Sequence, residues 1–246
     1  MPNHPLTVRV NCARQADCIA LAKRLDVDLL APDQPHTQGV LLEYKNGTLQ
    51  LVEADERSAP LCIELSQRKP GRGADPLLRA IGYKTESVID CTAGWCTDAS
   101  HIAGQGISVV AIEQHPVVFE LISDALSRCT DEQIKQHLKI VHANAVNWLN
   151  THNPSAEVIY LDPMYPPKPG SALPKKPLQL LHNLTTSMVQ HDVALLQKAS
   201  NFASRRVVVK RPHYSPPILP GKSGEIRAKL VRFDLYPPKF HSSSGS

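Results

Sequence analysis

The stretch Val88–Ser100, VIDCTAGWCTDAS, contains in direct succession an apolar run, a turn of small residues and the start of a helix. The apolar run is typical of a buried strand, and Asp90 stands where that strand ends. Ala93 and Gly94 carry little side-chain bulk, so the backbone of this turn can approach a ligand closely. The stretch predicts a strand–turn–helix unit whose turn binds a cofactor; the alternative is a plain strand-to-helix connection.

Strand and helix patterns alternate along the chain around this unit. Strands are predicted over 87–90, 107–113, 138–143, 156–162 and 205–211. Helices are predicted over 75–82, 98–104, 116–129, 145–150 and much of 178–203. Such alternation is typical of a doubly wound parallel α/β sheet. The alternating segment 226–236 predicts one more strand, antiparallel to the others.

The residues before this region predict a second, smaller unit. Residues 16–25 show helical spacing, and residues 39–56 read as two strands joined at the hairpin signal Asn46-Gly47. Residues 61–66 predict a third strand, and a basic break rich in Pro and Gly follows. We therefore expect a small α+β domain over 1–68, a main domain over 69–240 and a mobile tail over 241–246.

The composition excludes several classes of protein. No apolar run approaches the roughly 20 residues that span a bilayer, and the N-terminus lacks the pattern of a secretory signal. We therefore expect a cytoplasmic protein that does not bind membranes. The six cysteines and eleven histidines show no spacing typical of a zinc site, so we expect no metal and cysteines that are free, buried thiols.

The net charge of +4 is unevenly distributed along the chain. Residues 161–246 contain 13 Lys and Arg against 4 Asp and Glu, whereas the preceding residues are acidic. This asymmetry favours a polyanionic partner such as nucleic acid, and ordinary solvated lysines are the alternative. The candidate RNA contacts are Lys168, Lys175, Lys176, Lys210, Arg211 and Tyr214.

Glu113 ends the predicted strand 107–113 and follows Asp90 by 23 residues. An acid about 20 residues beyond a glycine turn commonly accepts hydrogen bonds from ribose hydroxyls, and Gln114 would then lie beside an adenine. A solvated strand end is the alternative. Only Gly94 of a dinucleotide fingerprint is present, so the turn offers no pyrophosphate cradle. This favours a cofactor without phosphates.

The stretch Val158–Pro167, VIYLDPMYPP, is a predicted strand that ends in a rigid turn. The lone pair of a guanine or adenine amine is delocalised into the ring, so a methylating site must hold the amine in line with the methyl donor and accept its hydrogens. Asp162 can supply one acceptor and the carbonyl of Pro163 another, while Tyr165 can stack on the base. A plain strand followed by a proline-rich loop is the alternative.

Five segments together resemble the bacterial ribosomal RNA small subunit methyltransferase J family. They are DCTAGWCTDA (90–99), LDPMYP (161–166), SALPKK (171–176), VVVKRPHYSPP (207–217) and RFDLY (232–236). The similarity extends over about residues 70 to 236 and implies a Rossmann-like class I methyltransferase sheet. It also implies methyl transfer from S-adenosylmethionine to the N2 amine of a guanine near the 3′ end of 16S rRNA, either in the RNA or in the small ribosomal subunit.

Carried over by position, the resemblance adds cofactor contacts to the Gly94 turn. The complete set is Gly94, Thr97, Asp98, Glu113, Gln114, Asn144, Ala145 and Asp162. The family's turn usually reads T-A-G-L-G-R-D, whereas this chain has Cys96 in place of the second glycine. The family often has small hydroxyl residues where Asn144 and Ala145 stand, so we expect backbone contacts at those two positions.

Two other functions are compatible with the same residues. An adenine-N6 methyltransferase that acts on DNA would use the same turn, because that amine poses the same chemical problem. A non-catalytic RNA-binding or ribosome assembly factor would retain the fold, and Cys96 in the turn keeps this alternative open. A nicotinamide-dependent oxidoreductase is disfavoured by the missing glycines.

Overall fold

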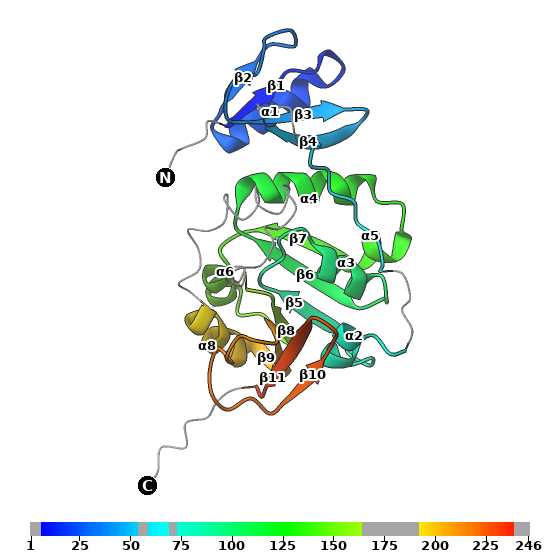
Figure 1. Ribbon diagram of the computed structural model, residues 1–246, viewed down its shortest axis with the longest axis vertical. Coiled ribbons are helices and arrows are strands. Elements are labelled where there is room, and N and C mark those ends of the chain that lie inside the picture. The colour runs from blue at the N-terminus through cyan, green and yellow to red at the C-terminus, as the bar shows by residue number, and fades with distance from the viewer. Residues whose placement is uncertain (1–5, 54–58, 69–72, 164–191, 239–246) are drawn as a thin grey trace.

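The computed structural model describes residues 6–53, 59–68, 73–163 and 192–238, and it contains two β-sheets (Figure 1). The smaller sheet has the strand order β2-β1-β3-β4, and the larger has the order β10-β11-β9-β8-β5-β6-β7. The strands of the smaller sheet are β1 (Leu6–Arg9), β2 (Asp28–Leu30), β3 (Val40–Lys45) and β4 (Thr48–Glu53). Those of the larger are β5 (Ser87–Asp90), β6 (Ser108–Glu113), β7 (Leu138–His142), β8 (Ala156–Leu161), β9 (Ala203–Pro212), β10 (Gly224–Arg227) and β11 (Val231–Tyr236).

The larger sheet is parallel from β7 through β6, β5 and β8 to β9, and β11 and β10 then add an antiparallel edge. After β5, the chain adds β6 and β7 on one side, and it then returns to place β8 and β9 on the other. Such a reversal is the switch point at which α/β sheets bind ligands, outside the carboxyl ends of the strands. The predicted doubly wound, Rossmann-like α/β fold is confirmed.

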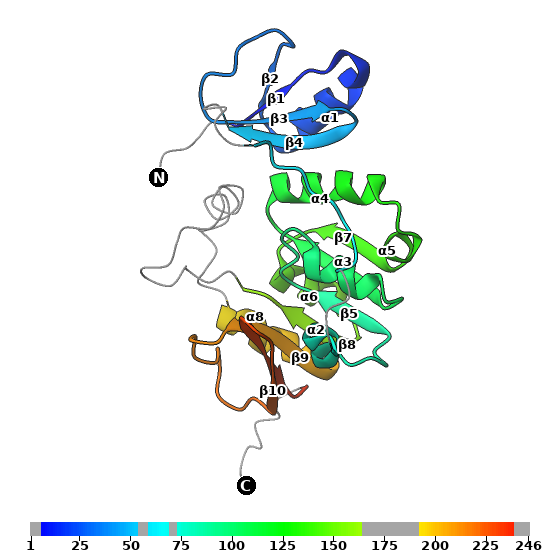
Figure 2. The same ribbon diagram turned by 45° about the vertical axis from the view of Figure 1, so that its right-hand side comes forward.

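Helices cover both faces of the larger sheet (Figure 2). The helices are α1 (Gln15–Leu25), α2 (Pro76–Ile81), α3 (Thr97–Ala103), α4 (Pro116–Arg128), α5 (Glu132–His137), α6 (Ala145–His152) and α8 (Asp192–Phe202). Val88 and Tyr160 belong to the core beneath α2, α3 and α4, whereas Ile89 and Leu161 belong to the core beneath α6 and α8. Neighbouring strand residues point to opposite faces, so the continuous apolar runs fill both cores.

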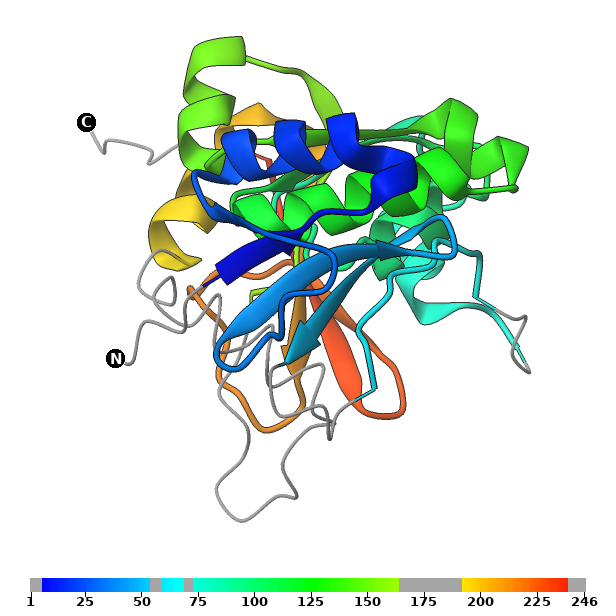
Figure 3. The same ribbon diagram turned by 90° about the horizontal axis from the view of Figure 1, so that it is seen from above.

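The helix α4 lies between the two sheets in both side views (Figures 1 and 2), and seen from above it runs beside α1 (Figure 3). Arg24 of α1 donates two hydrogen bonds, of 2.6 and 2.8 Å, to the carboxylate of Glu120 in α4. Asp124 accepts from the backbone N–H of Leu49 in β4 at 3.1 Å. Polar contacts therefore fasten the smaller sheet to α4. The division into domains at residue 68 remains a proposal.

Two predicted strands take a different form. Residues 61–66 make no strand: Leu61 forms an isolated bridge with Leu51, and the rest of the segment is neither helix nor strand, with Ile63 and Leu65 buried. The alternation of apolar and polar residues in this segment reflects burial against neighbouring side chains and not pairing in a β-ladder. The single strand predicted over 226–236 is instead the hairpin β10–β11, in which Ala228 donates to the carbonyl of Val231 at 2.8 Å.

Several other predicted elements and expectations differ from the structure. The strands β1 and β2 and the helix α5 were not predicted, because each is six residues or fewer and gives little periodic signal. Of the predicted helical region 178–203, residues 192–202 form α8, and residues 178–191 lie outside the described residues, as does the tail 241–246. The six cysteines are free thiols, but Cys12 and Cys62 are exposed. Within the described ranges, no helix is long and apolar enough to cross a membrane.

Candidate active site

The carboxyl ends of β5 and β8 bring together two motifs that are about 70 residues apart in sequence. Asp90, at the end of β5, accepts a hydrogen bond from the backbone N–H of Thr92 at 2.9 Å. The hydroxyl of Thr92 in turn accepts from the backbone N–H of Asp162, just after β8, at 2.6 Å. Thr92 therefore sets the distance between the glycine turn and the Asp162–Pro163 turn at the switch point.

Asp90 and Asp162 are both in an environment that disfavours charge. The pKa of Asp90 is raised to about 7, mainly because the carboxyl is buried; hydrogen bonds from Thr92 lower this pKa, and the charge of Asp162 also raises it. Burial also raises the pKa of Asp162, while the ammonium of Lys210 opposes that rise. The Asp162 side chain retains 35% exposure, so it is the member of the pair that a substrate can reach.

Glu113, at the end of β6, holds the glycine turn. Its Oε2 accepts from the N–H of Gly94 at 2.8 Å, and its Oε1 accepts from the N–H of His115 at 2.7 Å. The carboxylate is buried, and burial raises its pKa although these backbone hydrogen bonds lower it. Gly94 has φ +50°, a conformation that favours glycine. The carboxylate is thus fixed beside the turn where a ribose hydroxyl pair would bind.

Cys96 precedes α3 and adopts a left-handed backbone with φ +55° and ψ 20°. This is the position at which the resemblance predicts a glycine, and an L-residue there is strained by its Cβ. The Cys96 side chain is fully buried, so the thiol packs in the core and the turn forms without the glycine. Thr97, the first residue of α3, is exposed, and Asp98 behind it is buried.

Lys210 of β9 links the carboxylates of Asp98 and Asp162. Its ammonium donates to Asp98 Oδ2 at 2.9 Å and to Asp162 Oδ2 at 2.7 Å. The phenol of Tyr160 donates to the same Asp98 oxygen at 2.5 Å, and Arg68 forms an ion pair with Asp98. The network fixes both carboxylates and neutralises part of their charge.

Lys210 and Arg211, the predicted pair of phosphate contacts, lie on opposite faces of the sheet. Lys210 points to the carboxylates of the site, and Arg211 lies on the opposite face because strand residues alternate. Arg211 is buried and donates to the carbonyl of Pro216. Tyr214 is 57% exposed and stays available for stacking. Tyr165, Lys168, Lys175 and Lys176 lie outside the described residues.

The remaining predicted cofactor residues meet at the ends of β6 and β7. The Asn144 side chain donates to the Gln114 side-chain oxygen at 3.1 Å, and its own oxygen caps α6 by accepting from the N–H of Asn147 at 3.1 Å. Ala145 is the buried first residue of α6. Gln114 and Asn144 thus lie together on the side of β6 away from Asp162, where they would contact the base of a bound nucleoside.

Three residues of the site were not identified from sequence. Thr92 is the threonine of the D-x-T-A-G segment, and a hydroxyl two residues after a strand-end acid is a signal that could have been used. Tyr160 lies in an apolar run, where a phenol needs a buried hydrogen-bond partner. Arg68 gives no local signal, because it reaches Asp98 only through the fold.

The charges of the site suit a cationic cofactor. Four carboxyl groups surround the switch point, those of Asp90, Asp98, Glu113 and Asp162. Lys210 pairs with Asp98 and Asp162, and Arg68 pairs with Asp98. A sulfonium and an amino group fit such surroundings, whereas the phosphates of a dinucleotide would be repelled. The residues present therefore fit S-adenosylmethionine. Among the described residues, no group of three or more His, Cys, Asp or Glu could hold a metal ion.

Comparison with known proteins places the chain among methyltransferases. A family model described as "Putative SAM-dependent methyltransferase" matches residues 21–238. The chain is 35% identical to Ribosomal RNA small subunit methyltransferase J of Photorhabdus laumondii, covering 86% of this chain and 83% of the relative. It is 42% identical to the protein of the same name from Buchnera aphidicola, covering 79% of each. The crystal structure of a SAM-dependent methyltransferase from Neisseria gonorrhoeae, 24% identical, matches 95% of this chain and 96% of its own with a TM-score of 0.74.

Proposed function

The chain belongs to the ribosomal RNA small subunit methyltransferase J family of S-adenosylmethionine-dependent methyltransferases, and from this premise we propose that it methylates the N2 amine of a guanine near the 3′ end of 16S rRNA. The names of the relatives support ribosomal RNA of the small subunit as the substrate. The placement of Asp162 supports an exocyclic amine as the acceptor of the methyl group.

The observation that carries the proposal is the fixed carboxylate at the end of β8. Asp162 is held by a backbone hydrogen bond to Thr92 and an ion pair with Lys210, and its side chain is 35% exposed. A carboxylate fixed in this way accepts a hydrogen of an amine that becomes more positive as the methyl group arrives. The carbonyl of Pro163 would accept the second hydrogen, and Tyr165 would stack on the base.

Lys210 serves the same chemistry by keeping Asp162 ionised. Burial raises the pKa of Asp162, and a protonated carboxyl would lose acceptor strength toward the amine. The Lys210 ammonium, 2.7 Å from Asp162 Oδ2, opposes that rise. We therefore place Lys210 as a positioning residue of the active site, in contrast to the phosphate contact predicted from its position in the sequence.

The cofactor residues divide into three groups. The turn at Gly94 and the start of α3 with Thr97 and Asp98 would hold the amino acid part of S-adenosylmethionine, while Glu113 would accept from the ribose hydroxyls. Gln114, Asn144 and Ala145 would contact the adenine. When bound, this cofactor supplies a methyl group on a sulfonium, which an amine can accept directly. The residues at the site then need to orient and accept hydrogens, and no covalent enzyme intermediate is required.

The test is methylation of small-subunit rRNA, supplied as the transcript and as the assembled subunit, with a labelled methyl donor. Digestion to nucleosides and mass spectrometry should show N2-methylguanosine, and mapping should place it near the 3′ end. A matched DNA duplex and an rRNA lacking the 3′ region are the controls. Label in N6-methyladenine, or in the DNA alone, would contradict the proposal.

A further inference from the structure

A pocket of about 510 Å³ lies beyond the carboxyl end of β9, against the hairpin β10–β11. We call it the hairpin pocket; its polar and charged lining residues are His213, Ser215, Lys222, Glu225, Arg227 and Arg232. Because β9 is parallel to β8 and adjacent to it, the pocket opens at the same edge of the sheet as Asp162. The strands that form the pocket, β9, β11 and β10, are one, two and three positions away from β8 in the sheet.

Three arginines stand side by side across the strands that form the pocket. Arg211 of β9 is opposite Arg232 of β11, and Arg232 is opposite Arg227 of β10. Like charges directly opposite one another on a sheet are destabilising unless counter-charges balance them. The row therefore needs either carboxylates within the fold or an anionic ligand.

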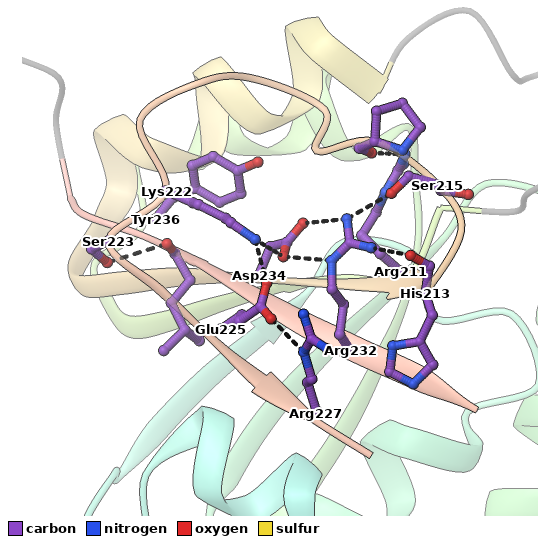
Figure 4. Close-up of polar contacts among 12 residues, drawn as sticks. Arg211, His213, Ser215, Lys222, Ser223, Glu225, Arg227, Arg232, Asp234 and Tyr236 are labelled. Atoms are coloured by element: carbon purple, nitrogen blue, oxygen red, sulfur yellow. Dashed lines mark hydrogen bonds and ion pairs between the residues drawn. The ribbon is translucent and has the colours of Figure 1, made fainter. Parts of the chain in front are cut away.

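In the part of the chain that the structure describes, two carboxylates lie beside Arg227, Arg232 and Lys222 (Figure 4). Arg232 Nε lies 2.9 Å from Asp234, Lys222 contacts Asp234 and Glu225 at 3.0 and 2.5 Å, and Arg227 Nε lies 2.6 Å from Glu225. Hydrogen bonds from Lys222 and Arg227 lower the pKa of Glu225 to about 2, so it is ionised at neutral pH. Within the described ranges, the two carboxylates of Asp234 and Glu225 thus face three cations, those of Arg227, Arg232 and Lys222, and this group retains an excess of positive charge.

The arginines differ in what they can offer a ligand. Arg232 is buried and donates to the carbonyls of Pro212, His213 and Ser215 as well as to Asp234, so it shapes the pocket wall. The side chain of Arg227 is 74% exposed, and its contact with Glu225 uses Nε. The outer nitrogens of Arg227 are therefore the donors best placed for an anion entering the pocket.

Two exposed apolar residues lie next to pocket-lining residues or strands along the chain. Tyr214, between the lining residues His213 and Ser215, is 57% exposed, and Leu230 in the turn of the hairpin is 78% exposed. A cationic groove beside an exposed aromatic ring is the arrangement that binds single-stranded nucleic acid, since the cations contact phosphates and the ring stacks on a base. An acidic protein would use the cations but has no need of the ring.

We propose that the hairpin pocket binds a phosphate of the RNA strand close to the methylated nucleotide, with Arg227 as the phosphate contact and Tyr214 as the stacking platform. The inference rests on the proposed function for the identity of the RNA. The arginine row projects from the face of the sheet opposite to Lys210, so the bound strand passes over the rim of the sheet between the pocket and Asp162.

The first test compares Arg227→Gln with Arg205→Gln in the full chain. Arg205, at the amino end of β9, also pairs with one glutamate, Glu157, and lies at the opposite edge of the same sheet. Affinity for a single-stranded fragment of small-subunit rRNA is measured over a salt series. Arg227→Gln should flatten the slope of log affinity against log salt by about 0.7. The loss of affinity relative to the wild type should therefore be about fivefold larger at 0.1 M salt than at 1 M salt. Arg205→Gln should match the wild type.

The second test compares Tyr214→Ala with Tyr83→Ala, because Tyr83 is similarly exposed, at 63%, but lies before β5. Tyr214→Ala should weaken RNA binding about fivefold or more without changing the salt slope, and Tyr214→Phe should restore it. Equal effects of the two alanine variants would overturn the stacking assignment.

The outcomes separate the pocket from the proposed function, because cofactor binding and methyl transfer are measured on the same proteins. If the wild type methylates rRNA but Arg227→Gln binds RNA as Arg205→Gln does, the pocket inference fails and the function stands. If Arg227→Gln weakens RNA binding although no rRNA is methylated, the pocket stands and the proposed function fails. A loss confined to binding of polyglutamate would overturn the inference in favour of an acidic protein.

Discussion

At the scale of single residues, Asp162 carries the largest expected effect. We predict that Asp162→Asn lowers kcat by about 10²–10³, because an amide can accept a hydrogen bond but carries no charge to stabilise the developing cation. Single-turnover methylation of small-subunit rRNA at saturating cofactor measures the effect, and a thermal melt checks that the fold persists. A rate near that of the wild type would remove Asp162 from the mechanism.

Glu113 is expected to act on cofactor binding instead. Glu113→Gln keeps the size of the side chain and removes its charge, so the ribose hydroxyls would lose a charged acceptor worth roughly 1.5–3 kcal/mol. Calorimetry should therefore show weaker binding of S-adenosylmethionine, while affinity for RNA should stay the same. An unchanged dissociation constant for the cofactor would reject Glu113 as the ribose ligand.

Cys96 tests the cost of a side chain in the glycine turn. Its φ of +55° strains any residue with a Cβ, so Cys96→Gly should be more stable than Cys96→Ala by about 1 kcal/mol, although both lose the buried thiol. Because both variants lack the thiol, its contribution to stability cancels in the comparison. Urea unfolding measures the difference, and an alanine variant at least as stable as the glycine variant would show that the turn has relaxed.

At the scale of elements, protonation of Asp90, where the ends of β5 and β8 meet, makes the stability of the fold depend on pH. Its pKa of about 7 lies above the value near 3.9 of an unfolded aspartate, so the folded state binds the extra proton between these values. This contribution to stability is fully present below about pH 4 and is lost as the pH rises through 7. Asp90→Asn should remove that dependence.

Urea unfolding at a series of pH values checks this prediction. The unfolding free energy of the wild type, relative to Asp90→Asn, should fall between pH 4 and pH 7 by up to about 1.4 kcal/mol per pH unit. A constant difference between the two proteins across this range would show that Asp90 is ionised throughout.

At the scale of the whole molecule, Asp124 of α4 joins the two sheets. Its carboxylate accepts from the N–H of Leu49 at 3.1 Å and from Arg128 Nε at 2.7 Å, and it is buried. Asp124→Ala should lower the free energy of unfolding by about 1–3 kcal/mol, because a buried N–H and a guanidinium lose their acceptor. The control is Glu64→Ala, since Glu64 also pairs with Arg128 but its side chain is 71% exposed.

Hydrogen exchange locates the effect of Asp124→Ala in the fold. The amide of Leu49 and its neighbours in β4 should exchange faster in this variant, while β8 and β9 keep their protection. Protection that falls equally in both sheets would mean that the contact supports the whole chain and not the junction.

Local pattern was enough to predict most of the larger sheet and both turns of the candidate site. Apolar runs bounded by caps and glycines identified β5, β6, β7, β8 and β9 to within three residues at either end, because such runs must be buried whatever their neighbours. The residues at the ends of these strands could then be predicted to lie at one site, since the carboxyl ends of parallel strands share an edge of the sheet. Asp162, Glu113 and Gly94 therefore came from sequence, and the structure places them around one switch point.

The partner of each polar group was decided only by the tertiary structure. Lys210 and Arg211 are adjacent basic residues, and only the strand alternation and the neighbours of β9 send one to Asp162 and the other into the opposite core. The left-handed backbone of Cys96 likewise depends on the space left around its thiol. The sequence by itself determined which segments are buried, because burial follows from composition and from the period of the apolar residues. Packing in the tertiary structure decided the contacts between distant segments, since the charge of a side chain does not specify which surface will face it.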